Sequence, residues 1–146
     1  MRLIGIDVGS SGTKIAAYSL NGTLLGSIEA PHTPHHPHPG AWEVDPDEVW
    51  RNAADALHRL AALNPVQRDP PMGIGISASM REAFPVDADG KALGPCIMTA
   101  DTRESGLEKT ILSQYPADRW FEFCGICPNE WTPFAGCYGG RRIVRK

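Results

Sequence analysis

The sequence has no apolar run near the roughly 20 residues that a membrane-spanning helix requires. The opening Met1-Arg2-Leu3 leads directly into strand-like residues rather than a signal peptide, so we expect a cytoplasmic protein. Charged residues make up only 21% of the chain and the net charge is −3. This charge gives no general reason to expect nucleic acid or an anionic membrane as a partner, so we expect neither.

Cysteine is also scarce, because the chain has four, too few and too unevenly placed for a secreted disulfide framework. Cys124 and Cys127 have the spacing of metal ligands or of a redox pair. A structural zinc site needs two further ligands, yet only Cys137 follows and no histidine comes after His58. Buried or idle thiols are therefore the favoured interpretation, and the role of Cys124 and Cys127 stays open.

With 146 residues, of which 42% are hydrophobic, the chain can bury roughly two-thirds of its unfolded surface. These values fit a soluble globular protein of one domain. We place the domain over residues 1–135 and an irregular basic tail over residues 136–146.

The first strand is predicted from Leu3 to Val8 and is expected to be buried. It runs into a turn of glycines and serines, Gly9 to Gly12, and leaves as a second strand. A turn with so little bulk lets backbone N–H groups point outward together, which suits phosphate oxygens. Asp7 beside such a site makes electrostatic sense chiefly if Mg²⁺ lies between them. An ordinary hairpin in which Asp7 binds turn amides explains these residues equally well.

Asn21-Gly22 separates two strand-like runs and predicts a tight hairpin, so three antiparallel strands begin the protein. The following segment, Pro31 to Gly40, contains four prolines and four histidines and is predicted to be an exposed loop. Histidines at this density can bind metal, but the segment has no acidic or cysteine partner, so we interpret them as incidental loop composition.

A helix is predicted to begin at Asp45, with Pro46 at its first position and Glu48 placed to complete a capping box. We expect it to end before Pro65 and to cover one face of the sheet. Its predicted apolar face consists of Val49, Trp50, Ala53, Ala54, Leu57, Leu60 and Ala61.

Beyond this helix we expect a short buried strand over residues 72–77. A second hairpin is predicted around residues 87–90, with arms over 82–86 and 91–93. Helices are predicted over residues 103–114 and 117–123.

Four segments in this order resemble the N-terminal part of the FGGY carbohydrate kinases, within the actin-like, ribonuclease-H-like phosphotransferases. Residues 4–14, Ile-Gly-Ile-Asp-Val-Gly-Ser-Ser-Gly-Thr-Lys, resemble the family's first phosphate motif. Residues 39–46 resemble its Pro-Gly-Trp-x-Glu-x-Asp-Pro segment, here with an extra alanine. Residues 76–82, Ile-Ser-Ala-Ser-Met-Arg-Glu, resemble the strand and loop that carry sugar contacts, and Asp101-Thr102-Arg103 resembles the Asp-x-Arg motif.

The resemblance implies an α/β, ribonuclease-H-like (actin-like ATPase) domain, incomplete here, with a three-stranded antiparallel meander and flanking helices. It also implies transfer of the γ-phosphoryl group of ATP to a sugar or polyol hydroxyl, with ATP and Mg²⁺ as cofactors. Asp7 would then hold Mg²⁺ through water. The residues implied to approach the ATP phosphates are Gly9, Ser10, Ser11, Gly12, Thr13 and Lys14. Lys14 as a solvated hairpin lysine is the alternative.

The residues implied to contact the substrate are Trp42, Arg81, Glu82 and Asp101. Arg81-Glu82 is similar to the pair in glycerol kinases and autoinducer-2 kinases, and its donors and acceptors suit adjacent hydroxyl groups. A surface ion pair is the alternative for these two residues. Trp42 can equally pack under the helix, and Arg103 can brace its loop.

Two departures from the family pattern matter. Thr99 stands where many members have a tryptophan, which leaves the apolar wall of the sugar site unassigned. By resemblance the general-base aspartate lies beyond Lys146, so we assign no catalytic residue and expect an inactive N-terminal fragment. A non-catalytic phosphate- or partner-binding module and another actin-like ATPase branch are the alternatives. Incompletely covered apolar surface also predicts a homo-oligomer.

Overall fold

The structure is a computed structural model that describes residues 1–67, 70–80, 82–103, 106–114 and 116–124. Within these residues the strands are β1 (Arg2–Val8), β2 (Gly12–Ser19), β3 (Leu24–Pro31), β4 (Glu43–Val44), β5 (Pro71–Ala78) and β6 (Cys96–Ile97). The helices are α1 (Pro46–Ala61), α2 (Asn64–Gln67), α3 (Leu107–Gln114) and α4 (Ala117–Cys124). None of these helices is both long and apolar enough to cross a membrane.

The residues gather into two compact units. The first contains Met1–Pro34 and Val44–Met80, and the second contains His35–Glu43 and the described residues between 82 and 124. Residues 136–146 lie outside the described residues, so the predicted division into a domain over 1–135 and a tail stays a prediction.

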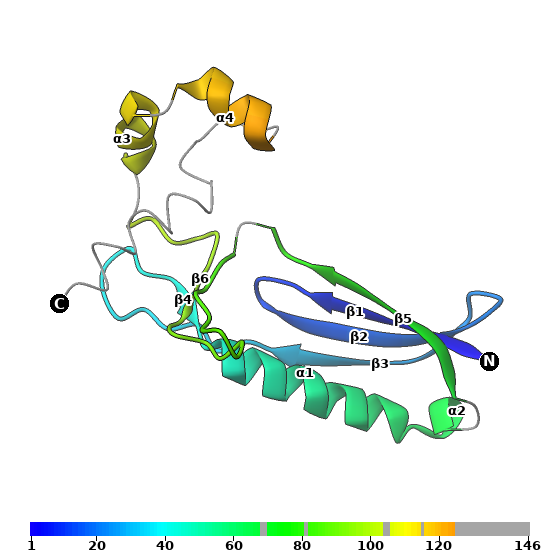
Figure 1. The fold of residues 1–146 in the computed structure, drawn as a ribbon. Coiled ribbons are helices and arrows are strands. Elements are labelled where there is room, and N and C mark those ends of the chain that lie inside the picture. The colour runs from blue at the N-terminus through cyan, green and yellow to red at the C-terminus, as the bar shows by residue number, and fades with distance from the viewer. Residues whose placement is uncertain (68–69, 81, 104–105, 115, 125–146) are drawn as a thin grey trace. The chain divides into compact units, whose positions relative to one another are not determined.

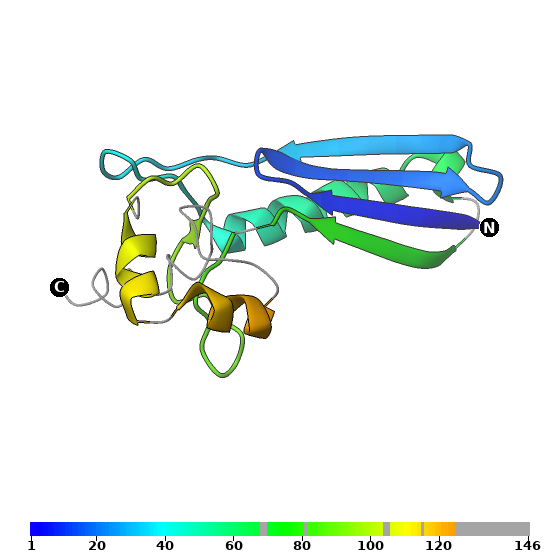
Figure 2. The same ribbon diagram turned by 90° about the horizontal axis from the view of Figure 1, so that it is seen from above.

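The first unit is built on a four-stranded sheet in the order β3-β2-β1-β5 (Figure 2). The β1–β2 and β2–β3 pairs are antiparallel, which confirms the predicted meander, and β5 joins β1 in parallel. Helix α1 supplies the long connection that a parallel pair requires and runs along one face of the sheet (Figure 1). This mixed sheet has the architecture predicted from the sequence.

The core of the first unit lies between α1 and the β2–β3 side of the sheet. Its buried members are Ile4, Ile15, Ala17, Ala30, Ala56, Leu60 and Val66. Along β1 burial alternates, since Ile4 is buried and Leu3 is exposed, so the prediction of a fully buried first strand is wrong. A strand covered on one face alternates in this way.

The strand predicted over residues 72–77 forms as β5, but the prediction that it is buried is wrong. Ile74 is 53% exposed and Ile76 is 72% exposed. The reason is topological, because β5 is an edge strand of the sheet and α1 packs on β2 and β3 at the other side.

Helix α1 begins as predicted, with the Asp45 side chain accepting a hydrogen bond from the Asp47 N–H. The Glu48 carboxylate does not follow the capping-box expectation, because it accepts a hydrogen bond from the Thr33 hydroxyl (2.6 Å). The predicted apolar face is also rotated: Ala56 and Leu60 are fully buried, whereas Trp50 is 74% exposed. Trp50 therefore lies on the flank of the buried stripe rather than in it.

β4 pairs with β6 in a short sheet that the sequence pattern did not predict. The turn at Asp87–Gly90 forms, but single bridges, Ala83–Ile97 and Val86–Ala92, replace the predicted hairpin arms. Helix α3 begins four residues later than predicted because Gly106, with φ of 94°, has a left-handed conformation that an α-helix excludes. Helix α4 forms where it was expected.

Candidate functional site

The turn between β1 and β2 is closed by a backbone hydrogen bond from the Gly9 N–H to the Gly12 carbonyl oxygen (3.0 Å). A β-carbon at position 12 would lie 2.8 Å from the Ala30 carbonyl oxygen and 3.0 Å from the Pro31 Cα atom. Gly12 is therefore required by the close approach of β3, whereas Ser10 and Ser11 are exposed at the tip. The turn is compact and presents hydroxyl groups to solvent.

One row of polar side chains crosses all four strands beside this turn. Asp7 is in register with Ser77 on β5 and with Lys14 on β2, and Lys14 is in register with Glu29 on β3. Directly opposed residues point to the same face of a sheet, and all four are exposed. We call Ser77, Asp7, Lys14 and Glu29 the polar row.

Contacts within the polar row join its four members in two pairs. The Ser77 hydroxyl donates a 2.7 Å hydrogen bond to Asp7 Oδ1, and Lys14 Nζ lies 3.6 Å from Glu29 Oε1. The side chains of Lys14 and Glu29 are 65% and 72% exposed, so solvent screens this pair. The row thus combines an oriented carboxylate with a lysine that is held only weakly.

The polar row offers few metal ligands. It therefore suits Mg²⁺, which keeps several water ligands, better than a metal ion that is coordinated by protein side chains alone. Within the described ranges no group of three or more His, Cys, Asp or Glu side chains is placed to hold a metal ion. Mg²⁺ usually keeps several waters and takes one or two carboxylates together with substrate phosphates. The exposed carboxylate of Asp7 fits that pattern.

Thr13 lies on the opposite face of β2 and is fully buried. Its Oγ1 atom is hydrogen-bonded with His32 Nε2 at 3.1 Å. A hydroxyl in this position points away from solvent, so the Thr13 side chain supports the turn from inside. A phosphate at the tip would meet Ser10 and Ser11 first.

The second unit contains a cluster of largely buried charges that we call the Asp101 clamp, formed by Glu43, Asp101 and Arg103. Arg103 Nη2 lies 2.7 Å from Glu43 Oε1 and 2.7 Å from Asp101 Oδ2. The Asp101 side chain is only 2% exposed. Asp101 Oδ2 also accepts a 2.8 Å hydrogen bond from the Trp42 backbone N–H, and Asp101 Oδ1 accepts one from the Arg103 backbone N–H.

These contacts shift both charged groups toward their ionised forms. Burial alone would raise the pKa of Asp101, but hydrogen bonds from Arg103 and from the Trp42 N–H lower it below its usual value. The hydrogen bond to Asp101 raises the pKa of Arg103, although burial opposes this, and Glu43 adds to the rise. Asp101 and Arg103 therefore stay ionised at neutral pH, and their hydrogen bonds fix the backbone of Trp42.

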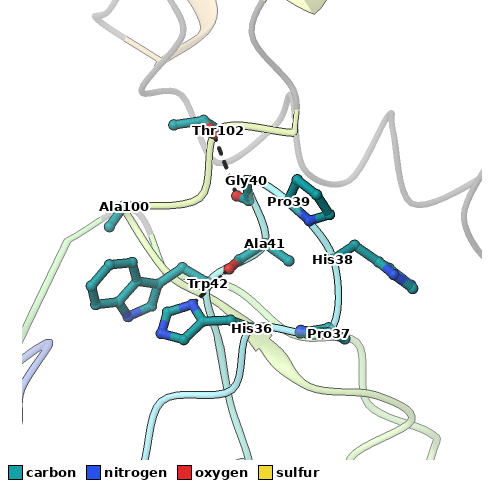
Figure 3. A pocket seen from close by; sticks show the side chains of 9 residues that line it. All are labelled: His36, Pro37, His38, Pro39, Gly40, Ala41, Trp42, Ala100 and Thr102. Atoms are coloured by element: carbon teal, nitrogen blue, oxygen red, sulfur yellow. Dashed lines mark hydrogen bonds between the residues drawn. The ribbon is translucent and has the colours of Figure 1, made fainter.

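A pocket of about 510 Å³ lies beside the clamp, between the loop of residues 36–42 and the backbone at Ala100 and Thr102. Figure 3 shows the Trp42 indole next to the His36 imidazole, and the two ring centres are 4.6 Å apart in an edge-to-face arrangement. The His36 ring is also hydrogen-bonded to the Ala41 carbonyl oxygen (2.9 Å). Trp42 is 40% exposed, so part of its ring is open to a ligand.

Residues 2–134 match the N-terminal domain of the FGGY family of carbohydrate kinases. The chain belongs to this family.

Curated relatives of this FGGY chain include gluconokinase from Bacillus subtilis, 28% identical over 91% of the chain and 26% of the relative. A probable L-xylulose kinase from Haemophilus influenzae is 36% identical over 68% of the chain and 21% of the relative. The structure of a xyloylose kinase from Brucella ovis matches 99% of the chain and 29% of its own length, with 25% identity and a TM-score of 0.84. The chain thus spans about a quarter of the length of these relatives.

The structure brings Trp42 and Asp101 of the FGGY motifs together through one hydrogen bond. Arg81, Cys127 and Cys137 lie outside the described residues. Glu82 is half-buried near Cys96, where burial raises the pKa of the Cys96 thiol to about 11 and the Glu82 charge adds to the rise. That thiol stays protonated at neutral pH, so it is unreactive.

Four residues with a place in these arrangements were missed by sequence reasoning: Glu29, His32, Glu43 and Ser77. Glu29 and Ser77 join the polar row through strand register, and a register with β5 is not readable before its neighbour is known. The sequence pattern places His32 in an exposed loop and gives no sign of its contact with Thr13. Glu43 and Arg103 both lie within family motifs and carry opposite charges, and this was the signal that could have indicated their ion pair.

Proposed function

We propose that this FGGY chain supplies the phosphate-binding and substrate-facing part of an ATP-dependent kinase for a sugar or polyol hydroxyl. The single observation that carries the proposal is the polar row beside the Ser10-Ser11 turn, in a chain of established family. Phosphoryl transfer depends chiefly on positioning and on neutralising the charge of the phosphates. Asp7 and Lys14 provide a metal ligand and a cation next to exposed hydroxyl groups.

In this proposal Asp7 holds Mg²⁺ through water, and the Ser77 hydroxyl orients its carboxylate. Bound Mg²⁺ neutralises charge on the ATP phosphates. The turn residues Gly9 to Gly12 approach the phosphates with backbone and hydroxyl groups, and Lys14 leaves Glu29 to pair with a phosphate oxygen. Thr13 contributes by supporting the turn.

On the substrate side, we propose that the exposed part of Trp42 forms a wall for the sugar, in place of the tryptophan that Thr99 replaces. Arg81 and Glu82 would bind hydroxyl groups of the substrate. The carboxylate of Asp101 already accepts hydrogen bonds on both oxygens, so we propose that it positions Trp42 and does not contact the substrate.

Gluconate, xylulose and glycerol are the substrates to compare. A reaction that uses ATP fits the predicted cytoplasmic location, and the exposed side chains of β5 fit the predicted homo-oligomer.

The proposal is tested by titrating the ¹⁵N-labelled chain with Mg·ADP and recording amide shifts. We expect saturable shifts at residues 9–14 that weaken when EDTA removes Mg²⁺ and weaken in Asp7→Asn. Asp87→Asn, in the turn of the second unit, is the matched control and should leave the titration unchanged. Absence of shifts at residues 9–14 at millimolar Mg·ADP would contradict the proposal.

A further inference from the structure

His32 lies just after β3, yet it makes two hydrogen bonds to the turn between β1 and β2 and to the first residues of β2. Its backbone N–H donates to the Ser11 carbonyl oxygen (3.1 Å), and its Nε2 atom is hydrogen-bonded with Thr13 Oγ1 (3.1 Å). These two contacts hold residues on both sides of Gly12. The backbone of β3 at Ala30 and Pro31 fills the space where a Gly12 side chain would be.

The burial of Thr13 gives the side-chain contact its weight. Thr13 is fully buried, and a buried hydroxyl without a hydrogen-bond partner is costly. A partner at this position therefore fixes the rotamer of Thr13 and, through it, the direction in which the chain leaves the turn. Gly12 and the serines before it have little bulk of their own to do so.

We propose that His32 is a positioning residue that holds the Ser11–Thr13 part of the turn in its phosphate-binding conformation. This inference rests on the proposed function of the turn. His32 touches no phosphate in this role, because its ring acts on the buried side of β2. Its loss would leave the turn chemically complete but free to move, so that phosphate binding would include the cost of ordering it.

The experiment compares Mg·ADP affinity, from the amide shifts of residues 9–14, among His32→Leu, His32→Gln and the unchanged chain. Leucine removes the ring contact, whereas the glutamine amide preserves a hydrogen-bonding group near the Nε2 position. We expect His32→Leu to bind about tenfold more weakly and His32→Gln to recover most of the affinity. Thr13→Val tests the partner, and in its background His32→Leu should have little further effect.

Several outcomes would overturn the inference. Equal affinity in His32→Leu, equal loss in His32→Leu and His32→Gln, or additive effects with Thr13→Val would each show that the ring contact does not position the turn. In these cases the unchanged chain still binds Mg·ADP, so the proposed function stands. If the unchanged chain does not bind, the proposed function and this inference both fail. Far-ultraviolet circular dichroism of each variant identifies a failure to fold. If His32→Leu does not fold, Thr13→Val takes its place as the variant without the contact, and unchanged affinity in Thr13→Val would overturn the inference.

Discussion

At the scale of single residues, Lys14 illustrates how a weak contact can serve a binding site. Its ammonium group lies 3.6 Å from Glu29, but both side chains are largely exposed. An exposed pair of this kind contributes at most about 1 kcal/mol, so a phosphate can displace Glu29 at little cost. In the proposed site the same carboxylate would compete with an incoming phosphate for Lys14.

We therefore predict that Glu29→Gln tightens the binding of Mg·ADP by about twofold to fivefold, because the competing charge is removed. The gain should shrink as salt is added, since the pair is solvent-exposed. Amide-shift titrations at two salt concentrations measure it. Glu122→Gln on α4 removes an equally exposed charge that pairs with Arg119, and it should leave the affinity unchanged. Unchanged or weaker binding in Glu29→Gln would show that Lys14 does not meet the phosphate.

At the scale of elements, the Asp101 clamp joins two segments that lie far apart in the sequence. Two backbone hydrogen bonds join the same segments: the Thr102 N–H donates to the Gly40 carbonyl oxygen (2.9 Å), and the Met98 N–H donates to the Trp42 carbonyl oxygen (3.0 Å). Arg103 Nη2 contacts both carboxylates, and Nε binds Asp101 as well, so Asp101 is held at two points by a planar fork that an ammonium lacks. The position of Trp42 thus depends on the clamp.

We predict that Arg103→Met exposes the Trp42 N–H, which donates to Asp101. Removing one partner from a buried ion pair costs about 3 to 5 kcal/mol. This pair is slightly exposed, so we expect a smaller cost, which still makes amide hydrogen exchange at Trp42 at least about tenfold faster. Arg103→Lys should be intermediate, because it keeps the charge and loses the fork. Amide hydrogen exchange at Trp42 measures both. Arg119→Met, in an exposed pair on α4, is the control, and unchanged protection in Arg103→Met would refute the bracing role.

The clamp also predicts a dependence on pH. The pKa of Asp101 is lowered in the folded chain, so its stabilisation is complete above the unfolded value of about 3.9 and is lost as pH falls through the lower folded value. We expect protection of the Trp42 N–H, corrected for intrinsic exchange, to decline only below about pH 4. Asp101→Asn should abolish this step. A decline centred near neutral pH would contradict the assignment.

At the scale of the whole molecule, the order of local signals was enough to predict the strand meander, α1 and the family. Asp45, Pro46 and the Asn21-Gly22 turn act through neighbouring residues, so a linear pattern captures them. Burial was harder to predict, because Ile76 has the residue type of a core strand while its exposure depends on which helix covers β5. The polar row was beyond the pattern for the same reason, since Ser77 meets Asp7 only through the pairing of β5 with β1.

The catalytic capacity of the whole chain is the remaining prediction. The chain spans about a quarter of the length of the relatives, and the function proposed for the polar row includes a metal ligand and a cation but no general base. A positioned base typically contributes about 10²- to 10⁴-fold to such a transfer. We therefore expect the 146-residue chain to bind Mg·ADP and yet to form no ADP from ATP above background with gluconate, xylulose or glycerol.

A coupled ADP assay measures this, with Bacillus subtilis gluconokinase and gluconate as the positive control. Binding without turnover would separate a missing catalytic group from a failure to fold. Turnover at rates typical of enzymes with any of these substrates would show that the chain carries its own catalytic base.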